Sequence, residues 1–151
     1  MPLKTIYKRN NLSLDNLKDA GDISEILDYL YLGGSNSVLD LDDLTRRHVT
    51  HIINCTRGMD VPINPKYKFH RIRFQIDDEP DTNITAVFDS AFEMIIEAKN
   101  SKNSALVHCK KGMSRSATIV MAYCMTYENM KAVDALRHLQ MKRPLVSPNP
   151  G

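Results

Sequence analysis

The segment 104–128 constrains the fold of this chain more than any other, because it joins a short apolar stretch to an apolar helix through a tight turn. The residues from Ser104 to His108 read Ser-Ala-Leu-Val-His, which predicts a short buried strand. A glycine-containing turn follows at 109–114, and residues 115–128 are apolar on most sides, which predicts a central helix. A buried strand that leads directly into a buried helix is typical of layered α/β domains.

The rest of the chain alternates strands and helices in the same way. Further short strands are predicted at 28–34, 50–55 and 67–76. A helix capped by Asp40 is predicted at 41–48, and a long one begins at Ile84, where apolar residues recur every three or four positions. Asn129 is predicted to cap a last helix that stops at Pro144. We therefore predict an α/β fold in a single domain, with a central, mostly parallel sheet of four to five strands flanked by helices.

Composition is that of one globular domain, with 151 residues, of which 42% are hydrophobic and 25% are charged. Residues 1–22 are polar and mixed, so they are expected to form an N-terminal extension with a short helix at 14–18. The formal net charge is 20 − 18 = +2, which provides no global basic field. We therefore expect no nucleic-acid partner, and any anion must be bound by a local arrangement of charge. Nothing in the sequence predicts an oligomeric state.

The cysteines and the chain start indicate the cellular compartment. The cysteines at 55, 109 and 124 form no CxxC pair, and with the five histidines they give no four-ligand zinc spacing, so no metal or cofactor is expected. The first residues lack the apolar core of a signal peptide, and the longest apolar run, 117–125, is far shorter than the roughly 20 residues of a membrane span. We therefore expect no membrane span, reduced thiols, and a cytoplasmic or nuclear location.

The turn after the buried strand has the composition of a phosphate-binding loop. It reads His-Cys-Lys-Lys-Gly-Met-Ser-Arg-Ser from His108 to Ser116. A tight loop that enters a helix directs successive backbone N–H groups inward, and the helix dipole adds positive potential. Gly112 permits the turn, and the planar Arg115 guanidinium can hold two phosphate oxygens. The loop residues expected around the phosphate are Lys110, Lys111, Gly112, Met113, Ser114 and Arg115.

The same loop predicts a cysteine nucleophile. A field that binds an oxyanion also stabilises a thiolate, and it lowers a thiol pKa from about 8.5 into the range of roughly 3.5–7.5. The Cys109 sulfur is then placed for in-line attack on phosphorus. The leaving oxygen needs a proton, and the acidic segment 77–81 is the expected source of the carboxylic acid. Ser116 is expected to donate a hydrogen bond to the Cys109 sulfur and to ease its departure.

Some of these residues also have simpler interpretations. Lys110 and Lys111 are either solvated charges or groups that steer an anionic substrate. The acidic segment also contains Asp81 and Thr82, either of which suits a helix cap. His108 is interpreted as a structural hydrogen-bond partner of the loop rather than as a base.

The cysteines have simpler interpretations as well. An isolated buried cysteine is usually inert, and only the surrounding loop favours a reactive Cys109. Cys55 and Cys124 are interpreted as core residues. The alternative is that either of them traps an oxidised Cys109 as a disulfide.

The loop sequence resembles the HCxxGxSRS signature of the cysteine-dependent dual-specificity protein phosphatases. Three other segments resemble the same family: Ile26-Leu-Asp-Tyr-Leu-Tyr-Leu-Gly, Thr50-His-Ile-Ile-Asn-Cys-Thr, and the final Arg143-Pro with Pro148-Asn-Pro-Gly. The resemblance covers residues 23–151 and is nearest to the slingshot-like and MAP-kinase-phosphatase-like branches. It implies that residues 23–151 form the phosphatase domain. Family members usually continue with Phe and a closing C-terminal helix, so either this protein lacks that helix or the chain is part of a longer one.

The family resemblance also implies the role of each site residue. It implies a nucleophile at Cys109, a phosphate-binding Arg115, a Ser116 hydroxyl that aids the second step, and an aspartic general acid. Asp77 and Asp78 both lie near the expected spacing from the cysteine. Because Asn83-Ile84 matches the Asn-Leu pair at the start of the family's helix, Asp78 is favoured over Asp77.

We therefore predict a protein phosphatase that removes phosphate from phosphotyrosine and from phosphoserine or phosphothreonine through a cysteinyl-phosphate. Its partner is then a phosphorylated protein substrate. One alternative is the same chemistry on a phosphoinositide or an RNA 5′-phosphate, which the lysines beside the loop favour. A second is a non-catalytic phospho-binding domain, and the presence together of Cys109, Arg115 and an acidic loop argues against it. A rhodanese-like sulfurtransferase also uses a loop cysteine, but it does not fit the Ser-Arg-Ser ending of the loop.

Overall fold

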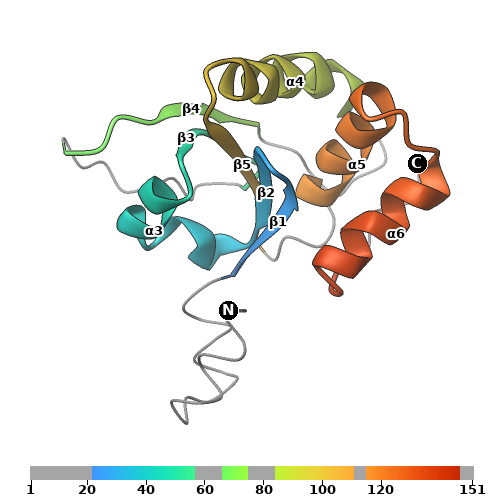
Figure 1. Ribbon diagram of the computed structural model, residues 1–151, viewed down its shortest axis with the longest axis horizontal. Helices are drawn as coiled ribbons and strands as arrows, with labels where there is room; N and C mark the ends of the chain where they lie inside the picture. Colours follow the sequence, from blue (N-terminus) through green and yellow to red (C-terminus); the bar gives the residue numbers. More distant parts are fainter. Residues whose placement is uncertain (1–21, 57–65, 75–83, 111–114, 147–151) are drawn as a thin grey trace, which may run out of the picture.

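One five-stranded sheet organises the computed structural model, which describes residues 22–56, 66–74, 84–110 and 115–146 (Figure 1). The strands are β1 Ile23–Leu27, β2 Leu30–Gly33, β3 Val49–Asn54, β4 His70–Arg73 and β5 Ser104–His108. They lie in the order β1-β2-β5-β3-β4. Only the β1–β2 pair is antiparallel, and the other three pairs are parallel. The sheet is thus mostly parallel, as predicted, and the C-terminal ends of its parallel strands share one edge.

Helices cover both faces of this sheet. They are α3 Leu41–Arg46, α4 Ile84–Asn100, α5 Arg115–Tyr127 and α6 Ala132–Lys142, with a short 3-10 helix, η1, at Ser35–Val38. α4, α5 and α6 gather on one side of the sheet, and α3 lies on the other (Figure 1). The helices described in these residue ranges include none that is long and apolar enough to cross a membrane.

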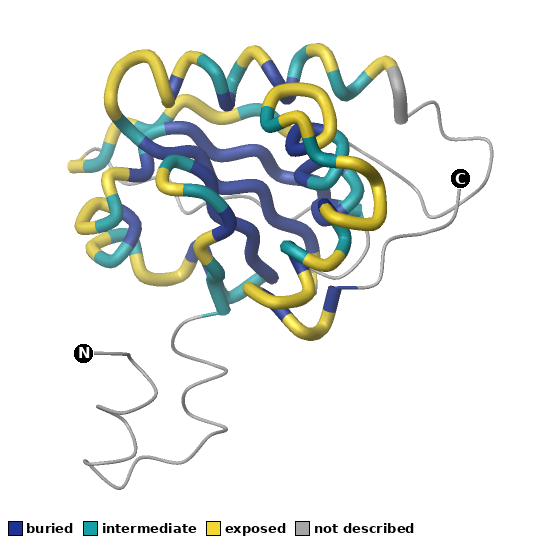
Figure 2. The backbone as a smooth tube through the Cα atoms, turned by 45° about the vertical axis from the view of Figure 1, so that its right-hand side comes forward, coloured by how far each residue is buried: buried dark blue, intermediate teal, exposed yellow. Residues whose placement is uncertain are grey.

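Alternation along the central strands divides the core between the two faces. Ile53 and Val107 belong to the larger apolar cluster under α4, α5 and α6, whereas Ile52 and Leu106 belong to the smaller cluster under α3. All five residues of β5 are buried, because β2 and β3 flank this strand on its two edges. Figure 2 shows the central strands as a buried layer inside the molecule. β5 is therefore enclosed by neighbouring strands on both edges and packed against α4 and α5.

Most predicted elements are present, with three differences. β1 is absent from the prediction, because its sequence Ile-Ser-Glu-Ile-Leu has no regular alternation. The strand predicted at 67–76 is shorter, since β4 spans only four residues at the edge of the sheet. The N-cap of α6 is Lys131 and not Asn129. Asn129 has a φ of 55°, the left-handed conformation that asparagine tolerates after a helix end, so it follows α5 instead of starting α6.

The other elements agree closely with the sequence pattern. Asp40 caps α3 as predicted, and its side chain accepts a hydrogen bond from the Asp43 amide at 3.0 Å. The predicted helix at 14–18, the loop after Arg57 as far as residue 65, and the acidic segment 77–81 lie outside the described residues.

Candidate active site

The candidate site lies where β5 ends and α5 begins. Cys109 is the first residue after β5, and it is only 3% exposed. Its amide donates to the Gly33 carbonyl at 3.2 Å, which extends the pairing with β2 by one residue. Lys110 follows on the surface, and Arg115 is the first residue of α5. The structure therefore brings the predicted nucleophile and the predicted phosphate-binding arginine to the start of the same helix.

The Ser116 hydroxyl is directed at the Cys109 sulfur. Its Oγ donates to Sγ over 3.0 Å, and the serine is fully buried. A hydrogen bond to the charged form of an acid favours ionisation, so this contact stabilises a thiolate over a thiol. The position of Ser116 is thus the one predicted from the sequence.

The N-terminus of α5 adds positive potential to the site. The helix has 13 residues and its N-terminal end follows the Cys109 loop directly. Unpaired N–H groups at a helix start attract anions, and both a thiolate and a phosphate are anions. Arg115 contributes a fixed positive charge at the same end.

The two other cysteines lie in the core, as predicted, and have a different character. Burial raises the pKa of the Cys55 thiol well above its ordinary value. The negative charge of an ionised Cys109 raises the Cys55 pKa further, whereas the Arg115 guanidinium lowers it. Burial also raises the pKa of Cys124 to about 11. Both thiols are therefore protonated at neutral pH.

Cys55 lies next to the candidate nucleophile. It follows Asn54, whose register partner on β5 is His108, and the Cys55 amide donates to the His108 carbonyl at 2.8 Å. Both Cys55 and Cys109 belong to the larger core cluster. The sequence gives no signal for this pairing, because register between distant strands cannot be read from either segment alone.

Several predicted site residues lie outside the described residues. These are the loop residues Lys111, Gly112, Met113 and Ser114 and the two candidate acids Asp77 and Asp78. Cys109, Lys110, Arg115 and Ser116 are therefore the site residues that the structure places.

The junction of β2 and η1 also contacts the loop that follows Cys109. This contact is not predicted from the sequence. The Ser35 amide and hydroxyl both donate to the Lys110 carbonyl, at 3.0 Å and 2.9 Å. The only signal in the sequence is the Gly33-Gly34-Ser35 run at the end of a predicted strand, which indicated a turn and nothing more.

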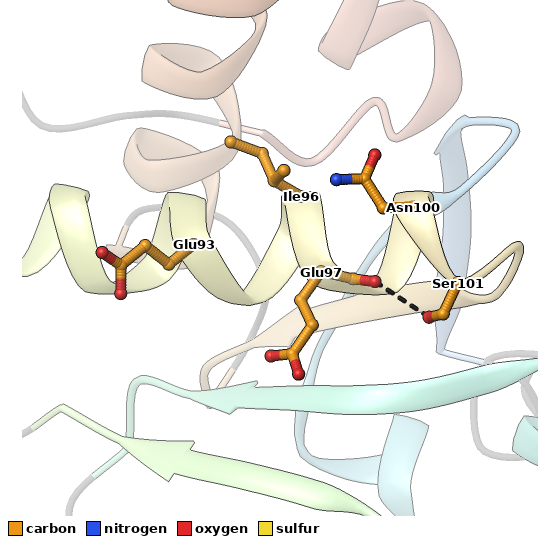
Figure 3. Close-up of a pocket in the computed structure, with 5 residues that line it drawn as sticks. All are labelled: Glu93, Ile96, Glu97, Asn100 and Ser101. Carbon is orange, nitrogen blue, oxygen red and sulfur yellow. Dashed lines mark hydrogen bonds between the residues drawn. The ribbon is translucent and has the colours of Figure 1, made fainter.

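An open groove of about 520 Å³ runs along α4, away from the cysteine loop. Figure 3 shows its lining residues on the one helix and the turn after it: Glu93, Ile96, Glu97, Asn100 and Ser101. Two carboxylates in the lining repel a phosphate, and the groove contains no nucleophile, so it is not the candidate site. In the described part of the chain, no cluster of three or more His, Cys, Asp or Glu side chains has the arrangement of a metal site.

Known proteins are similar to this chain in sequence and in fold. The family model described as the dual specificity phosphatase catalytic domain matches residues 30–151. Protein phosphatase Slingshot homolog 3 from Homo sapiens is 37% identical over 128 residues, which are 85% of this chain and 19% of that protein. Dual specificity protein phosphatase 1 from Arabidopsis thaliana is 38% identical over 122 residues, 81% of this chain and 61% of that protein.

A solved structure shows the same fold family as the sequence relatives. The crystal structure of the human tyrosine phosphatase-like serine/threonine/tyrosine-interacting protein matches with a TM-score of 0.77 and 34% identity, over 84% of this chain and 87% of that one. The chain spans between 12% and 19% of the length of the Slingshot relatives that it matches.

Proposed function

Because this chain belongs to the dual-specificity phosphatase catalytic-domain family, we propose that it hydrolyses phosphate monoesters on tyrosine and on serine or threonine side chains of proteins. The observation that carries the proposal is the 3.0 Å hydrogen bond from Ser116 to the Cys109 sulfur at the N-terminus of α5. A buried thiol with a donor and a helix terminus directed at it is arranged for ionisation rather than for packing.

The first chemical step is the transfer of the phosphoryl group to sulfur. The substrate dianion binds to the backbone amides of the loop and to Arg115, and the Cys109 thiolate attacks phosphorus in line with the leaving oxygen. The new S–P bond forms as the P–O bond to the side chain breaks. Asp78 donates the proton that the leaving oxygen needs.

The second step is the hydrolysis of the cysteinyl-phosphate. Water attacks phosphorus, the S–P bond breaks, and sulfur leaves as a thiolate. The Ser116 hydroxyl stabilises the charge that returns to sulfur, because it already donates to this atom. The carboxylate left on Asp78 takes the proton from the attacking water, which restores the starting state.

A phosphatase of this kind fits an intracellular signalling role. The three cysteines are all free thiols, which suits a reducing compartment such as the cytoplasm or nucleus. We include this location, and a phosphoprotein substrate in signal transduction, in the proposal.

A substrate panel tests the proposal directly. The purified chain is assayed for phosphate release from phosphotyrosine, phosphoserine and phosphothreonine peptides, from inositol phosphates and from RNA 5′-phosphates. We expect release from both the tyrosine and the serine or threonine peptides, without added metal and with inhibition by vanadate. Faster release from the inositol or RNA substrates contradicts a protein substrate, and no release from any of them contradicts an enzyme.

The identity of the general acid is a separate prediction. We expect Asp78→Asn to lower kcat for a phosphoserine peptide by about 100-fold, because the poor leaving group then departs without its proton. An aryl phosphate with a good leaving group is expected to lose much less. Asp77→Asn is the matched control, since it removes the neighbouring carboxylate. If only Asp77→Asn shows this leaving-group dependence, the acid is Asp77.

A further inference from the structure

Lys110, the residue after the candidate nucleophile, is hydrogen-bonded to the segment that follows β2. The Lys110 carbonyl oxygen accepts two hydrogen bonds from one residue, Ser35: from its amide at 3.0 Å and from its hydroxyl at 2.9 Å. Seventy-five positions separate the two residues in sequence. Two donors on one carbonyl fix its direction far better than one does.

Glycine at position 34 allows the close approach of the two segments without displacing either one. A Cβ atom on Gly34 would lie 3.2 Å from the Lys110 carbonyl oxygen and inside contact distance of the Asp22 carboxylate. The Gly34 amide donates to the Asp22 carbonyl at 3.1 Å, and Asp22 in turn pairs with the buried Arg143. The residue before Ser35 is therefore also held in place, through Asp22 and Arg143.

The anchor lies on the opposite side of β5 from Cys55. β2 flanks β5 on one edge, and the residue that holds Lys110 follows β2. β3 flanks β5 on the other edge, and Cys55 follows β3. The Cys109 sulfur belongs to the core cluster with Cys55 and contacts Ser116 of α5. The Lys110 carbonyl and the sulfur are thus held by different neighbours.

We propose that Ser35 is a positioning residue for the Cys109 loop, because its two donors hold the negative end of the Lys110 carbonyl dipole at β2 and away from the Cys109 sulfur. A carbonyl oxygen turned toward the site would repel the thiolate and a bound phosphate dianion. The effect on phosphate rests on the proposed function, whereas the effect on the sulfur does not.

Alkylation of the Cys109 thiol tests this role without any substrate. The rate of modification by iodoacetamide is measured from pH 5 to pH 9 on the full chain, with the modified cysteine identified by mass spectrometry. We expect Ser35→Ala to slow alkylation at pH 6 by about threefold to tenfold, because the thiol pKa rises when one of the two bonds is lost. At pH 9 the rate is expected to equal that of the wild type. A rate lowered equally at every pH indicates altered access and contradicts the proposal.

Two further variants separate positioning from simple damage to the fold. Ser35→Thr keeps the hydroxyl and is expected to restore the alkylation rate at pH 6 to within about twofold. Ser37→Ala removes a hydrogen bond of 2.5 Å to the Gly34 carbonyl in the same segment but leaves the contact with Lys110. It is expected to leave the alkylation profile unchanged. An unchanged profile in Ser35→Ala, no recovery in Ser35→Thr, or the same loss in Ser37→Ala overturns the proposal.

The phosphatase assay completes the test. We expect Ser35→Ala to lower kcat/KM for a phosphotyrosine peptide by about threefold to tenfold, and to weaken vanadate inhibition by a similar factor. If the wild-type chain releases no phosphate, the proposed function fails, and the alkylation profiles still decide the role of Ser35.

Discussion

β3 and β5 lie side by side and each is followed by a cysteine, yet the two strand ends differ in what satisfies their polar groups. After β3 the cysteine is held through its backbone, since the Cys55 amide donates to the His108 carbonyl at 2.8 Å, and the Thr56 amide and hydroxyl both donate to Asn54 Oδ1, at 2.8 Å and 2.6 Å. After β5 a side-chain donor reaches the cysteine sulfur itself, from Ser116 of α5, and Ser35 donates to the Lys110 carbonyl.

This difference predicts opposite character for the two neighbouring thiols. Cys55 is fully buried, and its pKa is raised by burial first and by the charge of Cys109 second. Cys109 is almost as buried, at 3% exposure, but its sulfur receives a hydrogen bond from the hydroxyl of Ser116 in the first turn of α5. We therefore expect the element that follows each strand, and not burial alone, to decide whether its thiol ionises.

The largest expected effect separates the two cysteines. Cys109→Ser is expected to lower phosphate release from an aryl phosphate by at least about 1000-fold, because a hydroxyl at this position is not ionised at neutral pH. Cys55→Ala is expected to change the rate by less than about threefold, since its thiol stays protonated. Equal losses in both variants, with both proteins folded by circular dichroism, contradict the distinction between the two strand ends.

The next largest effect concerns the charge at the start of α5. Arg115→Lys keeps the charge but removes the planar pair of donors, so we expect kcat/KM to fall by about 100-fold to 1000-fold. Lys110→Ala is the control, because this exposed lysine is also next to the loop. The expected loss for Lys110→Ala is about threefold at low salt, and it disappears at high salt if the lysine only steers the substrate.

The smallest of the three expected effects is that of the serine hydroxyl. Ser116→Ala is expected to lower kcat for an aryl phosphate by about tenfold, since a hydrogen bond to a charged group is lost. The loss falls on hydrolysis of the cysteinyl-phosphate, so rapid mixing is expected to show a burst of the phenol product. A slow first step with no burst assigns Ser116 to formation of the thiolate alone.

The sequence pattern predicts the local elements of this fold well and its long-range contacts poorly. The strand 104–108 and the long helix from Ile84 to Asn100 both follow the predicted boundaries, because their apolar patterns are continuous. β1 is not predicted, since a strand at the sheet edge with mixed polarity depends on its partner for its stability.

In the candidate site, too, the local contacts are predicted from the sequence and the long-range contacts are not. The position of Cys109 after a strand and of Ser116 in the first turn of a helix is predicted from local residue types, and the Ser116 contact has the expected partner. The Ser35 anchor is missed, and the sequence does not decide between Cys55 and Cys124 as the neighbour of Cys109, because each contact depends on strand order and register rather than on a local motif.

The pH dependence of thiol alkylation at Cys109 and Cys55, followed by mass spectrometry in one sample, is the most direct measurement of the difference between the two strand ends. The expected result is that Cys109 reacts with an apparent pKa below about 7.5, while Cys55 remains unmodified across the neutral range. If the Cys109 thiol titrates near 8.5, as a free cysteine does, the claim that its surroundings after β5 stabilise a thiolate is wrong.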